Sequence, residues 1–63
     1  MFRLTIEREK HGWSRAELGR RTSIHPADIG KFESGRLVPY PSQLKRIAEE
    51  LAVPSDELLE EVK

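Results

Sequence analysis

The side chains that could do chemistry in this sequence are mainly basic, and they are concentrated in its first half. Residues 1–36 carry eight Lys and Arg against five Asp and Glu, a net charge of +3, whereas residues 37–63 carry three against six, a net charge of −3. Such an asymmetry indicates an anionic partner for the first half. Charge alone nevertheless favours a simpler interpretation, in which these groups solvate the surfaces of helices.

Catalytic and metal-binding chemistry finds little support in the residue types. The chain contains no cysteine, which excludes a disulfide, a zinc ribbon and a thiol nucleophile. His11 and His25 are accompanied by no further cluster of ligands, so we expect neither a metal site nor a cofactor. There is no persuasive Ser/His/Asp order and no phosphate-binding glycine loop. We therefore expect no enzymatic activity and no small-molecule ligand.

The length of 63 residues predicts a single domain over residues 1–63 with a small core. Without disulfides or a metal, packed helices are the economical way to stabilise a chain this short. No apolar run is long enough for a membrane span or for the core of a signal peptide, so we expect a cytoplasmic protein with no membrane partner.

Glycine and proline divide the chain into short helices. Gly12 and Gly35 are typical of the residue that follows a helix, and Pro26, Pro41 and Pro54 are typical of helix starts. Apolar residues recur between these breaks at the spacing of one helix face. The sequence thus predicts a compact all-α fold of four to five helices, at about residues 3–11, 15–21, 25–34, 41–51 and 54–62, with the last helix turning Leu58, Leu59 and Val62 inward.

The second and third helices form the arrangement of a helix-turn-helix, at about residues 15–34. Ser14 and Glu17 have the spacing of a capping box, in which each side chain accepts a hydrogen bond from the other residue's N–H. Thr22–Ile24 would be the turn, and Ala16 and Gly19 are small enough for close helix approach. Four apolar residues would hold the crossing, namely Leu18, Ile24, Ile29 and Phe32.

Over nearly its whole length, from about Leu4 to Leu59, the chain resembles the phage-repressor/Cro-type helix-turn-helix family, also called the XRE family. The resemblance rests on an ordered set of residues rather than on one strong motif. It implies a lambda-repressor-like DNA-binding domain, usually dimeric on double-stranded DNA and usually a transcription regulator. The matching residues are Gly12-Trp13-Ser14-Arg15-Ala16-Glu17-Leu18-Gly19, Ile24, Ile29, Glu33-Ser34-Gly35-Arg36, Pro39, Leu44, Ile47-Ala48, Leu51, Val53 and Asp56-Glu57-Leu58-Leu59.

The resemblance also implies which residues would meet DNA. The second motif helix would enter the major groove, where its side chains touch base edges. Arg15 stands where the family usually has Gln and would bind phosphate, as would Arg36 beyond the second motif helix. Arg8 and Glu33 would form a structural ion pair. The helix that reads the bases would present His25, Pro26, Ala27, Asp28 and Lys31.

This reading surface is poorly equipped for direct contact with bases. Pro26 and Ala27 carry no hydrogen-bonding side chain, Asp28 repels phosphate, and Gly30 leaves a gap in the helix. His25 could contact phosphate or only cap the helix. The alternative function is therefore a protein-interaction module that keeps the helix-turn-helix scaffold and has little DNA readout. By the resemblance, candidates for a dimer surface are the region of the fourth and fifth helices and the residues Leu37, Val38 or Val62, with the alternating apolar residues at the N-terminus as a further candidate.

Overall fold

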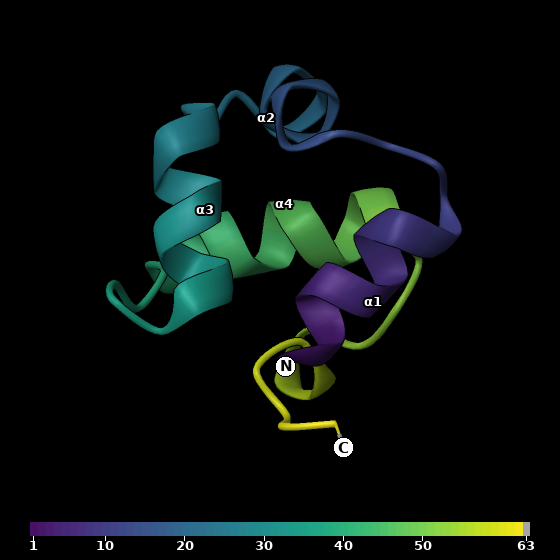
Figure 1. Cartoon of the computed structure of the whole chain (residues 1–63), viewed down its shortest axis with the longest axis vertical. Coiled ribbons are helices and arrows are strands. Elements are labelled where there is room, and N and C mark those ends of the chain that lie inside the picture. Colours follow the sequence, from purple (N-terminus) through teal and green to yellow (C-terminus); the bar gives the residue numbers. More distant parts are fainter. Residues whose placement is uncertain (63) are drawn as a thin grey trace.

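The computed structural model describes residues 1–62 as four α-helices and one short 3-10 turn. In Figure 1, α4 crosses the middle of the molecule, α2 lies above it, α3 stands at one edge, and α1 lies near both chain ends. No strand occurs within residues 1–62, so the predicted all-α fold is confirmed. Lys63, the last residue of the predicted domain, lies outside the described part. The elements are α1 (Arg3–Lys10), α2 (Arg15–Thr22), α3 (Pro26–Ser34), α4 (Pro41–Leu51) and the 3-10 turn η1 (Ser55–Glu57).

Every helix contributes to one apolar core. The face of α4 predicted from its spacing is confirmed, because Ile47, Ala48 and Leu51 are buried and Leu44 packs against them. Trp13, which directly precedes the N-cap residue Ser14 of α2, also packs against this core. The buried apolar residues are Leu4, Leu18, Ile24, Ile29, Phe32, Ile47, Ala48, Leu51 and Leu58.

Only half of the predicted capping box forms at the start of α2. The Glu17 N–H donates to the Ser14 hydroxyl at 3.1 Å, which satisfies one of the backbone donors that a helix start leaves unpaired. The Glu17 carboxylate, however, turns to the guanidinium groups of Arg20 and Arg21, at 2.7 and 2.8 Å. These charge-assisted hydrogen bonds are stronger than a hydrogen bond from the Ser14 N–H, so the Glu17 carboxylate does not complete the predicted capping box.

Thr22 belongs to α2 rather than to the turn. Its side chain is buried, and its hydroxyl donates to the Leu18 carbonyl at 2.7 Å, one helical turn back. The helix ends at Ser23, whose φ of 59° is left-handed. The connection between the motif helices is therefore Ser23–His25, one residue later than predicted.

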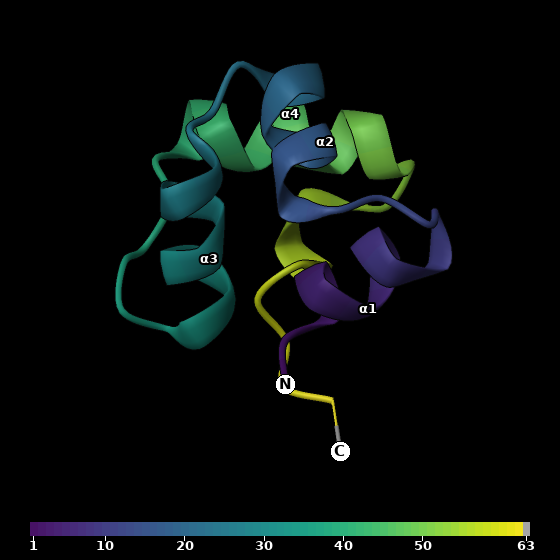
Figure 2. The ribbon, with the colours of Figure 1, turned by 45° about the horizontal axis from the view of Figure 1, so that its top comes forward.

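The two ends of the chain lie side by side (Figures 1 and 2) and stabilise each other. Helix α1 has no side-chain cap, and its first N–H groups instead donate to the opposite end of the chain. The Arg3 N–H bonds the Glu60 carbonyl and the Leu4 N–H bonds the Leu58 carbonyl, both at 2.9 Å. An isolated antiparallel bridge between Phe2 and Glu61 continues this pairing.

The predicted fifth helix is wrong, because only Ser55–Glu57 forms a 3-10 turn, Leu58 and Leu59 form a further turn, and Glu61 then pairs with Phe2. A helix through residues 58–62 would bond those backbone groups internally. Here the same segment supplies acceptors to the start of α1. Leu58 still points inward and is fully buried, whereas Leu59 and Val62 are half-buried.

Candidate nucleic-acid interface

Close contact between α2 and α3 sets the geometry of the helix pair. A Cβ atom on Gly19 would collide with the Ile24 carbonyl oxygen and would lie 3.3 Å from the ring of Pro26. Glycine is therefore required at this position for the chain to enter α3. Ala16, the other small residue predicted to allow close helix approach, is exposed, so its small size does not serve this contact. Beneath the crossing, Ile29 and Phe32 are buried and fix the rotation of α3 about its axis.

The face of α3 opposite this core is exposed to solvent. Ala27 and Lys31 lie one turn apart on this face, and Ser34 continues the exposed stripe. Pro26, Asp28 and Gly30 are half-buried at its margins. Of the residues predicted to face bases, the structure thus places Ala27 and Lys31 most openly.

His25 caps α3. Its side-chain Nδ1 accepts a hydrogen bond from the Ala27 N–H at 3.1 Å, and its carbonyl accepts from the N–H groups of Asp28 and Ile29 at 2.9 and 3.2 Å. Pro26 has no N–H to offer. The backbone N–H groups of Ala27, Asp28 and Ile29 at the start of α3 are therefore already used inside the protein, so they are not free to bind a phosphate.

Arg8 and Glu33, the pair predicted from the resemblance, lie close together, and Arg15 joins them as a third member. Arg8 Nε donates to Glu33 at 2.7 Å, and Arg15 Nε donates to the other carboxylate oxygen at 3.0 Å. The Glu33 side chain is only 4% exposed and that of Arg8 10%, whereas Arg15 is 57% exposed. Arg8 also donates through Nη1 to the Trp13 carbonyl at 2.8 Å, so this cluster links α1, the α1–α2 connection, α2 and α3.

Sequence reasoning missed the third member of this cluster. Arg15 was assigned to phosphate alone, and Gly30 was interpreted only as a gap. In the structure the Arg15 side chain lies over Gly30, where an added Cβ would meet Arg15 Cδ at 3.7 Å. A glycine inside an amphipathic helix is itself a signal of close packing, and it could have indicated this contact.

Arg20 and Arg21 are engaged on α2 itself. Both pair with Glu17, and the Arg20 hydrogen bond lowers the pKa of that carboxyl while the same contact raises the pKa of Arg20. Arg21 also lies over the ring of Trp13, 4.2 Å from its centroid. These two arginines thus stabilise the outer surface of α2.

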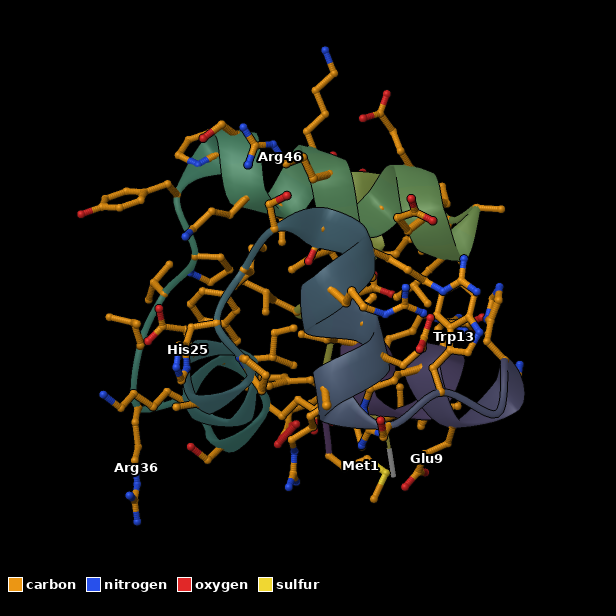
Figure 3. All side chains as sticks on the ribbon, turned by 90° about the horizontal axis from the view of Figure 1, so that it is seen from above. Met1, Glu9, Trp13, His25, Arg36 and Arg46 are labelled. Atoms are coloured by element: carbon orange, nitrogen blue, oxygen red, sulfur yellow. The ribbon has the colours of Figure 1, made fainter. Side chains whose placement is uncertain are left out.

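The loop after α3 carries one basic side chain and several exposed apolar side chains next to α3. Arg36 is exposed and projects away from the body of the molecule (Figure 3). The loop follows the outer edge of α3 towards α4 (Figure 2). Its Val38 and Tyr40 are 76% and 72% exposed, and Leu37 is exposed as well. The predicted phosphate-binding Arg36 therefore borders an apolar patch, Leu37–Tyr40, in which Leu37, Val38 and Tyr40 are exposed and only Pro39 is buried.

The two histidines and the acidic side chains were the remaining candidates for a metal site. No group of three His, Asp or Glu side chains in this range is placed to hold a metal ion. His11 bonds the Glu7 carbonyl through Nδ1 at 2.8 Å, and its ring lies 4.6 Å from that of Trp13 in a tilted arrangement. Within the same range, no helix is long and apolar enough to cross a membrane.

Comparison with known proteins supports the arrangement of α2 and α3. A sequence model of the family described as a helix-turn-helix domain matches residues 2–62, nearly the entire chain. No curated protein and no solved structure shows significant similarity. Because the match covers all four helices and the pairing of the chain ends, the chain belongs to the helix-turn-helix domain family, of the XRE/Cro-like, lambda-repressor type.

Proposed function

We propose that this chain is a DNA-binding transcriptional regulator that places α3 in the major groove of double-stranded DNA. The observation that carries the proposal is the exposed face of α3, which Gly19 and the buried Ile29 and Phe32 hold against α2 in a chain of this family. A major groove about 12 Å wide admits one helix presented in this way. The proposal includes no enzymatic step, and it fits the cytoplasmic location expected from the sequence.

Each exposed side chain has a distinct role in this proposal. Lys31 reaches guanine O6 or N7, and Ala27 contacts a thymine methyl group. Asp28, at the margin of the face, accepts from cytosine N4. Arg36 and Arg15 bind phosphates, which fixes the register of the helix on the duplex without reading sequence.

The start of α3 contributes through its cap rather than through free N–H groups. His25 holds Ala27 by its hydrogen bond, and Pro26 restricts the backbone at the same point. Both residues therefore orient the first turn of the helix that enters the groove. With so few donors on this turn, part of the specificity would come from the shape of the DNA.

Fluorescence anisotropy of a pooled random-sequence duplex, titrated with the protein across a salt series, tests the proposal. Phosphate contacts release counterions, so we expect affinity to fall steeply as salt rises. Sequencing the bound fraction would then give the operator. Absence of binding at low salt would refute the proposal.

We further propose that the chain binds DNA as a homodimer. Two copies would contact half-sites about 34 Å apart, one helical turn of DNA, as the family's geometry implies. The exposed Leu37 and Val38 support a contact on the loop side, whereas Val62 is half-buried and its N–H bonds the Met1 carbonyl. Sedimentation of the free and DNA-bound protein would give the stoichiometry.

The second candidate is a protein-interaction module, and one specific observation favours it. The patch Leu37–Tyr40 exposes three large apolar side chains beside Arg36, on a domain whose reading helix offers few hydrogen-bond donors. Exposed apolar surface of this kind is found at protein contacts. The salt series separates the two candidates, because a protein-interaction module would show no salt-dependent binding to the duplex.

A further inference from the structure

The contact between Arg15 and Gly30 is unusual because it joins a cation at the start of α2 to a bare stretch of backbone on α3. Gly30 and Glu33 are three residues apart, so they lie on the same side of α3. The Arg15 side chain crosses α3 at Gly30 and ends on Glu33. An added Cβ on Gly30 would lie 3.7 Å from Arg15 Cδ and 3.9 Å from its Nε.

Glu33 binds Arg15 through a single nitrogen of the guanidinium group, Nε. Arg8 takes one carboxylate oxygen through Nε at 2.7 Å and approaches the other through Nη2 at 3.3 Å. Arg15 reaches the second oxygen through Nε at 3.0 Å. Its two Nη groups are not used in this bond, and the side chain remains 57% exposed. The cluster contains two guanidinium groups and one carboxylate, so it carries a net positive charge towards solvent.

We propose that Gly30 is a positioning residue that seats Arg15 on Glu33 and so holds the Arg15 Nη groups ready for a DNA phosphate. The inference rests on the proposed DNA-binding function and explains a glycine that weakens the helix. A flexible arginine loses side-chain entropy when it binds, and an arginine already held in place loses less. The planar guanidinium can bind the buried carboxylate with Nε and still present two N–H-bearing nitrogens to phosphate.

The first test observes Arg15 in the free protein by ¹H–¹⁵N NMR of arginine Nε–H groups, with R15A used to assign the signal. We expect a slowly exchanging Arg15 Nε–H in the wild type. The larger side chain in G30L would occupy the space beside position 30 in which the Arg15 side chain lies, so it should abolish this protection. G30A is the matched control, because its Cβ makes an ordinary contact at 3.7 Å and should leave the signal protected. Retention of the protected signal in G30L would refute the role of Gly30 in positioning Arg15 on Glu33.

The second test measures DNA affinity in a salt series for the wild type, R15A, G30L and the double variant R15A/G30L. Each single variant should reduce the slope of log K against log salt by about one, the loss of one phosphate contact. Because both act through Arg15, the double variant should bind no more weakly than the worse single variant. G30A should bind as the wild type does.

The two tests separate the inference from the function on which it rests. Additive losses in the double variant would show that Leu at position 30 obstructs DNA directly, and would refute the positioning role. Wild-type protein that binds no duplex would refute the phosphate role together with the proposed function. In that case the Nε–H signal would still decide whether Gly30 seats Arg15 on Glu33.

Discussion

Replacing Glu33 by Gln would remove the one carboxylate within ion-pair distance of Arg8 among residues 1–62, while keeping the size of the side chain. Glu33 is 4% exposed and Arg8 10%, so the variant leaves a guanidinium buried next to a neutral amide. Breaking a buried ion pair from one side costs about 3–5 kcal/mol. The loss at Arg15 adds little, since that side chain is 57% exposed and returns to water.

The size of this loss is large compared with the stability of so small a domain. At about 0.05–0.15 kcal/mol per residue, a chain of this length is stable by roughly 3–9 kcal/mol. E33Q should therefore lose about a third or more of its free energy of unfolding at 25 °C. Arg8 would keep its bond to the Trp13 carbonyl at 2.8 Å, which places the expected loss at the lower end of the range for a buried pair.

Urea unfolding followed by the fluorescence of Trp13, the single tryptophan, measures this loss. E9Q is the matched control, because Glu9 is exposed on α1 and should change stability by less than about 0.5 kcal/mol. R8M should cost much less in the E33Q background than in the wild type, because the carboxylate it pairs with is already gone. An E33Q protein within about 0.5 kcal/mol of the wild type would refute the argument from burial.

Three further outcomes are expected from other parts of the helix pair. K31A should weaken binding to a selected operator and relax its preference at one base position by about 1–3 kcal/mol, and unchanged affinity and preference would mean that Lys31 does not face the groove. G19A should destabilise the fold by about 2 kcal/mol or more in thermal unfolding, because its Cβ meets the Ile24 carbonyl, and full stability would show that the backbone yields easily. Arg20 lowers the pKa of the Glu17 carboxyl below its ordinary value of 4.5, so the pair stabilises the fold above that value and its contribution is lost as pH falls through the lowered pKa. Comparison of wild type with E17Q by thermal unfolding across pH should show the difference closing at acid pH, and a difference that grows there would contradict the sign.

Local signals were sufficient to predict most of the fold. Gly35 and Pro41 mark a helix end and a helix start through backbone geometry that each residue imposes on itself. The spacing of Ile47, Ala48 and Leu51 gives the buried face of α4, because burial follows the helical period. Such features depend on residues that are neighbours in the sequence, so they can be predicted from the sequence alone.

Two of the features that sequence reasoning missed depend on residues far apart in the chain. The segment after η1 does not continue as a helix, because the carbonyl groups of Leu58 and Glu60 bond the first N–H groups of α1, more than fifty residues earlier. The helical spacing of Leu58 and Val62 does not reveal this competition. Arg15 was likewise assigned to phosphate only, because its bond to Glu33 and its contact with Gly30 exist only once α2 and α3 have crossed.

The distribution of charge shows why the net charge of the first half is a poor measure of its affinity for an anion. Three glutamates there each pair with two basic side chains, and only one of these clusters, that of Glu33, borders the exposed face of α3. Lys31 and Arg36, by contrast, have no carboxylate within ion-pair distance among residues 1–62. Under the proposed function, three basic side chains beside α3 would be available to a duplex, namely Lys31, Arg36 and Arg15, although residues 1–36 hold eight. We therefore expect the placement of these few cations, rather than the excess of +3, to set the electrostatic contribution to DNA binding. The other two clusters are Glu7 with Arg3 and Lys10, and Glu17 with Arg20 and Arg21.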